Sequence, residues 1–139
     1  MAQKKETSGS APRDMQERTI PVVKQHAGEE ESMIKHIVMW NVRGDTPNEK
    51  ADAVDRVKAA FEGLMGKIPG LLHLEIGVDV SRVDYACDVV LYSEFDSAES
   101  LAQYAVHAEH LRVKDELGDL RVARHQVDYV CSFFGVTVG

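Results

Sequence analysis

The sequence predicts an α+β fold of the split βαβ type, in which a four-stranded antiparallel sheet carries both helices on one face. Two observations lead to this prediction. Strand and helix patterns follow one another in the order strand, long helix, strand, strand, shorter helix, strand. The first strand, residues 33–42, is largely apolar on both sides, which is typical of a strand covered on both faces. A second copy of the chain, stacked sheet to sheet in a symmetric dimer, would cover the free face.

The chain divides into three parts by composition. Residues 1–32 contain no Phe, Trp, Tyr or Cys and end close to the acidic run Glu29–Glu31, a composition typical of a disordered leader. We expect the folded domain at residues 33–134. Residues 135–139 then form a short C-terminal tail.

The long helix is expected to begin at Pro47 and to be stopped by Pro69 and Gly70. Thr46 before Pro47 and Glu49 after it form the pattern of a capping box. The helix has one apolar stripe at spacings of three and four, which would cover one side of the sheet. The stripe consists of Ala51, Val54, Val57, Phe61, Leu64, Met65 and Ile68.

Three further strands complete the sheet. Residues 71–80 alternate between apolar and mixed positions, residues 86–95 supply the third strand, and residues 122–133 supply the last. The shorter helix begins after Ser97, whose hydroxyl can cap it, and runs to Leu111. The charged stretch 112–119 is expected to be a helical turn or loop.

The shorter helix gathers three side chains that exchange protons or hydrogen bonds near neutral pH: Tyr104, His107 and His110. Tyr104 lies on the apolar face and His107 lies near it. His110 follows Tyr104 by six residues, roughly 240° around a regular helix. Both can therefore line one pocket only if the helix bends or restarts between Val106 and Glu109.

The pattern Tyr104-x-x-His107-x-x-His110, together with the opening strand from Met33 to Trp40, resembles the stress-responsive A/B barrel (Dabb) domain family. The resemblance covers about residues 33 to 131. It implies a ferredoxin-like fold that pairs with a second copy as a dimeric α+β barrel. The usual family form has proline after the first histidine, where this chain has Ala108.

The resemblance also implies a chemistry. Plant members that cyclise polyketide chains have a Tyr and a His matching Tyr104 and His110, and a further His matching His36. Their third-strand histidine is absent here, with Val89 near its place. A phenol that donates to a carbonyl oxygen and a histidine that accepts a proton suit aldol or Claisen-type cyclisation. The implied site is a small hydrophobic pocket for a β-keto or aromatic acid, with Tyr104 and His110 as the acid–base pair. Its ligand-binding residues are His36, His107 and Trp40.

Three other interpretations stay open. Tyr104 can be a core residue whose hydroxyl is tied to a neighbour, with His107 and His110 as polar anchors of a turn. The protein can instead be a non-enzymatic, stress-related oligomer that binds a small ligand. Its apolar wall would consist of Met39, Trp40, Phe61, Leu64 and Met65. A relative of the haem- or quinol-type monooxygenases is the third alternative. No metal or other cofactor is expected, since His107-x-x-His110 offers too few ligands for zinc.

Composition excludes several classes of partner. The formal charge is −7, from 16 Lys and Arg against 23 Asp and Glu, and the basic residues are scattered, so nucleic acid is not an expected partner. No apolar run has the length of a membrane span and no secretory signal opens the chain, so we expect a cytoplasmic protein without membrane contact. Cys87 and Cys131 fall in predicted strands, where we expect small buried side chains rather than a disulfide.

Overall fold

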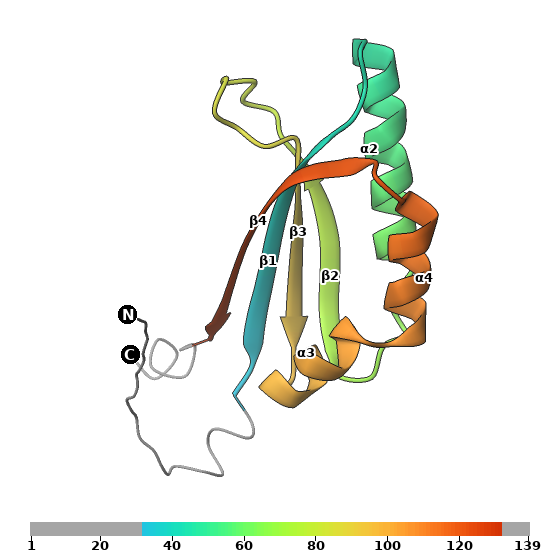
Figure 1. Ribbon diagram of the computed structural model, residues 1–139. Helices are drawn as coiled ribbons and strands as arrows, with labels where there is room; N and C mark the ends of the chain where they lie inside the picture. Colours follow the sequence, from blue (N-terminus) through green and yellow to red (C-terminus); the bar gives the residue numbers. More distant parts are fainter. Residues whose placement is uncertain (1–31, 132–139) are drawn as a thin grey trace, which may run out of the picture. The chain divides into compact units, whose positions relative to one another are not determined.

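The computed structural model describes residues 32–131, which form a four-stranded antiparallel sheet with three helices on one face (Figure 1). The strand order is β2-β3-β1-β4. This confirms the predicted ferredoxin-like split βαβ fold. The predicted leader and C-terminal tail lie outside the described residues, except for Ser32. The elements are β1 (Ile34–Val42), α2 (Pro47–Glu62), β2 (Leu71–Val78), β3 (Val89–Phe95), α3 (Ala98–Ala105), α4 (Ala108–Leu117) and β4 (Arg121–Val130).

Strand β1 lies inside the sheet and pairs with β3 on one side and β4 on the other. Its side chains that face the helices are all buried: Ile34, His36, Val38, Trp40 and Val42. On its other side Lys35 and Ile37 are half-buried and Met39 is exposed. Within the described residues the helices therefore cover only one of the two apolar sides of this strand.

Helix α2 begins as predicted and ends earlier. Thr46 caps it, with its hydroxyl accepting from the Glu49 N–H at 3.1 Å, and Pro47 is its first residue. The helix ends at Glu62 with Gly63 as its C-cap, and the chain then turns through Gly66 at a φ of +85° before the next strand. The buried face also differs from the predicted stripe. Ala53 and Ala60 are buried, whereas Ala51 and Met65 are exposed. Small alanines allow the helix to approach the sheet closely.

The core lies between the sheet and the helices. Its fully buried side chains come from α2, the turn after it, the sheet and α4, and they include Val57, Phe61, Leu64, Leu91, Phe95 and Val113. The predicted strands are all present, with ends that coincide or differ by up to three residues. Cys87 and Cys131 lie just outside strands, half-buried and free, which corrects their predicted place. No helix in residues 32–131 is long and apolar enough to cross a membrane.

The predicted single helix from Ser97 to Leu111 is in fact two helices. Ser97 caps α3 as expected, with its hydroxyl accepting from the Ser100 N–H at 3.1 Å. The helix ends at Ala105, and α4 begins at Ala108. The charged stretch 112–119, expected to be a helical turn or loop, is mostly the second half of α4, whose buried Val113 and Leu117 pack into the core.

Gly70 lies directly before β2 and packs against Ser100 of α3, which gives a test of this packing. Its φ is +83°, and an added Cβ would lie 2.2 Å from Ser100 Oγ. Gly70→Ala should therefore destabilise the fold by about 3 kcal/mol or more, from backbone strain and a clash. Gly66→Ala is the matched control, because Gly66 has a φ of +85° with nothing within 4 Å of the added Cβ. It should cost only about 1–2 kcal/mol of strain. Urea unfolding measures both, and equal losses would contradict the predicted clash.

Candidate active site

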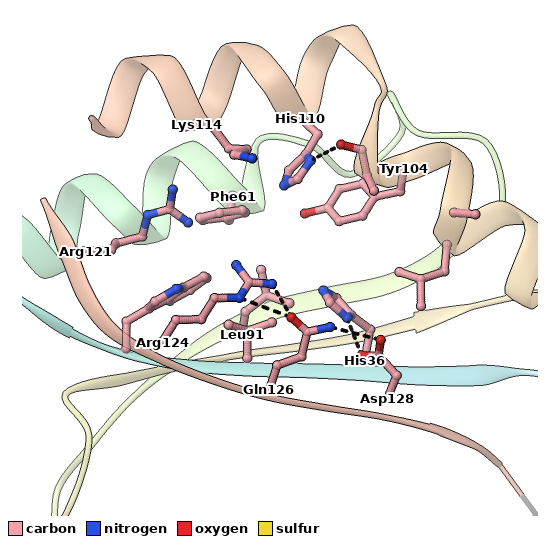
Figure 2. Close-up of a pocket in the computed structure, with 15 residues that line it drawn as sticks. His36, Phe61, Leu91, Tyr104, His110, Lys114, Arg121, Arg124, Gln126 and Asp128 are labelled. Atoms are coloured by element: carbon pink, nitrogen blue, oxygen red, sulfur yellow. Dashed lines mark hydrogen bonds and ion pairs between the residues drawn. The ribbon is translucent and has the colours of Figure 1, made fainter. Parts of the chain in front are cut away.

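A cavity of about 210 Å³ lies between the helix-facing side of β1 and β4 and the helices α3 and α4 (Figure 2). Four of the five site residues named from the sequence line it: His36, Trp40, Tyr104 and His110. His107 does not. Of the expected apolar wall, Trp40 and Phe61 line the cavity, whereas Leu64 is buried elsewhere in the core and Met39 and Met65 are exposed.

The break between α3 and α4 brings Tyr104 and His110 together. In the observed structure their ring centroids are 4.2 Å apart and the ring planes are inclined by 32°. The restart that a shared pocket requires is therefore present. His107 explains why the helix can restart without the proline that is usual in the family at the position of Ala108. Its Nδ1 accepts a hydrogen bond from the Glu109 N–H at 3.0 Å, so its imidazole is the N-cap of α4.

Tyr104 is the buried phenol of the site. Its side chain is 3% exposed and packs against Phe95, with ring centroids 5.1 Å apart. Figure 2 shows its hydroxyl pointing into the cavity, and no group within residues 32–131 forms a hydrogen bond with it. Burial raises the pKa of Tyr104 far above its ordinary value of 10.0, so the phenol stays protonated. It is a hydrogen-bond donor without a partner in the part of the chain that the structure describes.

His110 is held as a neutral imidazole. Its Nδ1 lies 3.3 Å from the carbonyl oxygen of Ala105, which can only accept, so Nδ1 carries the hydrogen. Burial lowers the pKa of His110 below its ordinary value of 6.5, and the positive charges of Lys114 and Arg121 lower it further. The other ring nitrogen faces the cavity (Figure 2) and has a free lone pair. His110 can therefore accept a hydrogen bond from a ligand at neutral pH.

His36 and Asp128 form the second pair of the site. They lie opposite one another on β1 and β4, and His36 Nδ1 is 2.6 Å from Asp128 Oδ1. Because a carboxylate only accepts, Nδ1 is the donor and Nε2 is left as the basic nitrogen. The ring is 6% exposed, and Figure 2 shows its second nitrogen turned toward the cavity. A histidine oriented by a carboxylate in this way is the usual arrangement of a general base.

The Asp128 carboxylate is in turn held by hydrogen bonds between side chains of the same strand, β4. Its Oδ2 accepts from Gln126 Nε2 at 3.0 Å, and Gln126 Oε1 accepts from Arg124 Nε at 3.1 Å. Arg124, Gln126 and Asp128 thus form a chain of hydrogen bonds on one side of the strand. This chain fixes the carboxylate that orients His36.

The prediction from the sequence did not include the charged and polar residues that line the β4 side of the cavity. The signal for Arg124, Gln126 and Asp128 was present, since they alternate along the predicted last strand on what becomes its helix-facing side. Lys114 and Arg121 also line the cavity. Lys114 was hidden in a stretch expected to be a turn or loop, and Arg121 has the wrong parity for that face in a regular strand.

The arrangement can transfer protons on a small molecule. It offers one neutral phenol as donor, two imidazole nitrogens as acceptors and a cationic side. No three His, Cys, Asp or Glu side chains within residues 32–131 lie close enough together to hold a metal ion. His107 and His110 in particular do not converge on one point, since His107 caps α4 from outside the cavity.

Comparison with known proteins places this fold. The family model described as "Stress Responsive A/B Barrel Domain" matches residues 34–131. The comparison with curated proteins found no match. A dimeric ferredoxin-like protein from Bacteroides fragilis is 34% identical, with a TM-score of 0.63, and the alignment covers 71% of this chain and 96% of that one.

Two more distant structures share the fold. A dimeric ferredoxin-like protein from Thermobifida fusca is 22% identical with a TM-score of 0.61, covering 72% of this chain and 92% of that one. The hydroxynitrile lyase from Passiflora edulis is 16% identical with a TM-score of 0.61, covering 73% of this chain and 95% of that one. With the family model matched over the whole described sheet and its helices, this chain belongs to the stress-responsive A/B barrel (Dabb) domain family.

Proposed function

We propose that this Dabb-domain protein is a homodimeric acid–base catalyst with cyclase-like chemistry on a small β-keto or aromatic acid. One observation carries the proposal. The basic nitrogen of the His36–Asp128 pair and the unpartnered phenol of Tyr104 face the same cavity of about 210 Å³. A base and a hydrogen-bond donor at a shared void are what removal of a proton next to a carbonyl group requires.

The proposed reaction begins when His36 Nε2 removes a proton from the carbon next to a substrate carbonyl. The electron pair of the C–H bond moves onto the carbonyl oxygen, where the Tyr104 O–H donates to the developing enolate. The enolate carbon then attacks a second carbonyl carbon of the same molecule and forms the new C–C bond. The resulting alkoxide takes the proton back from the His36 imidazolium, so no proton is gained or lost.

His110 has a different role from the one inferred from the sequence, where it was the base. Burial lowers the pKa of His110, which weakens it as a base, and it lacks a carboxylate partner within residues 32–131. We assign the proton abstraction to His36 and give His110 the task of accepting a hydrogen bond from an enol or hydroxyl group of the substrate. Trp40 and Phe61 form the apolar wall, stacked with ring centroids 5.4 Å apart.

The homodimer is supported by the face of the sheet that the helices leave uncovered. Its central part is apolar on three strands, namely Ile37 and Met39 of β1, Val90 and Tyr92 of β3, and Val127 and Tyr129 of β4. Val127 is 55% exposed and Tyr129 is 45% exposed. An apolar patch of this kind marks an interaction site. The relative from Bacteroides fragilis, 34% identical, is described as dimeric. Two sheets packed through this face would form the α+β barrel.

The main alternative is a non-enzymatic, stress-related oligomer whose cavity binds a small ligand without turnover. The hydroxynitrile lyase and the other distant neighbours do not decide between the two, because at their identities they show the fold alone. A monooxygenase role of the haem or quinol type draws support from no specific contact in residues 32–131. The proposal therefore rests on the cavity itself.

Deuterium incorporation tests the proposed reaction. In D₂O, the full chain should accelerate exchange of the protons next to the carbonyl of pyruvate, acetoacetate or benzoylacetate, as followed by proton NMR against the spontaneous rate. Tyr104→Phe and His36→Gln should each lower the enzymatic rate by about a hundredfold or more. Asp128→Asn should lower it about tenfold, because His36 loses the group that orients it.

His73→Gln is the control, since His73 lies on the opposite face of the sheet, half exposed and paired with Glu75. It should retain the full exchange rate. If all three compounds bind, as judged by a raised melting temperature, yet exchange no faster than in buffer, the non-enzymatic alternative is correct. An equal loss in the His73 variant would show that the cavity is not the site of exchange.

The neutral state of His110 predicts how stability depends on pH. Its pKa in the folded state lies below 6.5, so the unfolded chain takes up a proton at this side chain first as the pH falls. Its contribution to stability is fully present above pH 6.5 and is lost as the pH falls below that value. His110→Gln should therefore flatten the acid side of the stability curve measured by urea unfolding. His73→Gln is again the control, and equal curves for His110→Gln and the wild type would contradict the prediction.

The dimer predicts the effect of a charge on the open sheet face. Val127→Lys should weaken self-association at least about tenfold, because it buries an ammonium group without a partner in the interface. Sedimentation velocity over a range of concentrations measures the effect. Val106→Lys, at a more exposed valine between α3 and α4, should leave the dimer unchanged. A monomeric wild type, or a dimer that survives Val127→Lys, would contradict this interface.

A further inference from the structure

We propose that Arg121, assisted by Lys114, forms an anion subsite that binds the carboxylate of the substrate. This inference deepens the proposed function and rests on it. Figure 2 shows Arg121 at one end of the cavity and Tyr104 at the other, with Phe61 between them and Lys114 above Phe61. The subsite would hold the acid group at one end and leave the reacting carbonyl next to the phenol.

The first support is the state of the Arg121 side chain. Its guanidinium lies against two aromatic rings, 4.8 Å from the centroid of Trp40 and 5.2 Å from that of Phe61. Its Nε is shielded from solvent and has no hydrogen-bond partner, and no carboxylate of residues 32–131 pairs with it. Arg43 and Arg112 differ, since both lie near carboxylates of the chain. A cation that is partly removed from water without a counter-ion is costly, so an anion in the cavity would stabilise it.

The second support is the balance of charge around the cavity. Three cations line it, Lys114, Arg121 and Arg124, against one carboxylate, that of Asp128. Asp128 already accepts from His36 and Gln126. Arg124 is bound to Gln126 through two of its nitrogens. Arg121 and Lys114 are therefore the cations without a hydrogen-bonded partner in the described part of the chain, and the cavity as a whole favours an anionic ligand.

The third support is the backbone of β4. Across β1, Met39 lies opposite His125 and Asn41 lies opposite Val122, so β4 contains one extra residue at this point. Ala123 has a φ of +55°, in the left-handed region of backbone conformation that residues other than glycine rarely adopt. In a regular strand Arg121 would point to the opposite face from Arg124. The bulge reverses that parity and turns Arg121 into the cavity. Bulges that re-aim a side chain are enriched beside active sites.

These observations define the class of substrate. The carboxylate would bind Arg121 and Lys114, because a guanidinium matches a carboxylate in geometry and charge. The aliphatic or aromatic part would lie along Trp40 and Phe61. The carbonyl would reach Tyr104, with the neighbouring carbon toward His36. We therefore infer a small oxo acid that carries one carboxylate.

Paired ligands that differ only in charge test the subsite. Acetoacetate and its neutral amide, acetoacetamide, are to be titrated into the full chain, and the dissociation constants measured by the fluorescence of Trp40, the single tryptophan of the sequence. Calorimetry provides the second measurement. The wild type should bind acetoacetate at least about tenfold more tightly than the amide. Arg121→Gln should abolish that preference while binding the amide as before.

Two variants make the result specific. Arg112→Gln removes the same charge from α4, where the guanidinium pairs with Glu109 and Glu116, and should keep the wild-type preference. Lys114→Gln, at an exposed position, should reduce the preference by a smaller factor and covers the case in which Arg121→Gln does not fold. The subsite is overturned if the wild type shows no preference for the carboxylate, or if the preference survives in full in Arg121→Gln. If Arg121→Gln does not fold, an undiminished preference in Lys114→Gln overturns it. Tighter binding of inorganic phosphate than of acetoacetate would also overturn it.

The outcome is separable from that of the proposed reaction. Tyr104→Phe should retain the preference for the carboxylate and lose proton exchange. Arg121→Gln should lose the preference in binding, whereas Arg112→Gln, outside the cavity, should keep both the preference and the exchange. A charge preference without any exchange in the wild type would retain the subsite and refute the reaction. Exchange of both compounds without any preference for the acid in binding would retain the reaction and refute the subsite.

Discussion

The capped break between α3 and α4 is the constraint on which the site depends. A continuous helix would place Tyr104 and His110 roughly 240° apart, on different sides of its axis. The hydrogen bond from the Glu109 N–H to His107 Nδ1 satisfies an otherwise unpaired donor at the new start, a contribution of about 1 kcal/mol for a typical N-cap. With that start in place, the His110 ring lies against Tyr104 while Val113 and Leu117 still reach the core. His107 thus shapes the cavity without lining it.

The order and type of the elements could be predicted because their periodic patterns are strong. The strand alternation from Leu71 and the capped start at Pro47 are local signals, and the structure bears both out. The second half of α4 was missed because only Val113 and Leu117 are apolar there, which is one contact per turn and a weak stripe. The early end of α2 was missed because the apolar stripe continues through Leu64 and Ile68, which lie in the turns after the helix and are still buried.

The site was predictable only as a set of residue types. Tyr104 and His110 could be named from their chemistry and His36 from the family resemblance, but the same chemistry named His107, whose role as a cap depends on a backbone N–H two residues later. Alternation could place Asp128 on one face of the last strand, but its pairing with His36 follows only from the register of β4 on β1, since register is a property of two strands. Arg121 could not be found by alternation at all, because the bulge at Ala123 inverts the parity on which alternation depends.

The position of β4 at the edge of the sheet explains how a small domain can hold this many polar groups beside its core. An edge strand has solvent along one side, so Arg124, Gln126 and Asp128 are not fully desolvated, and their mutual hydrogen bonds satisfy much of the rest. His36 comes from the neighbouring inner strand and is buried, which places its basic nitrogen where the polar edge meets the apolar core. On the core side, Trp40 and Phe61 exclude water from the same space. The strand order therefore creates a boundary between polar and apolar surroundings, and a base placed at such a boundary is oriented by its carboxylate while its target is shielded from solvent.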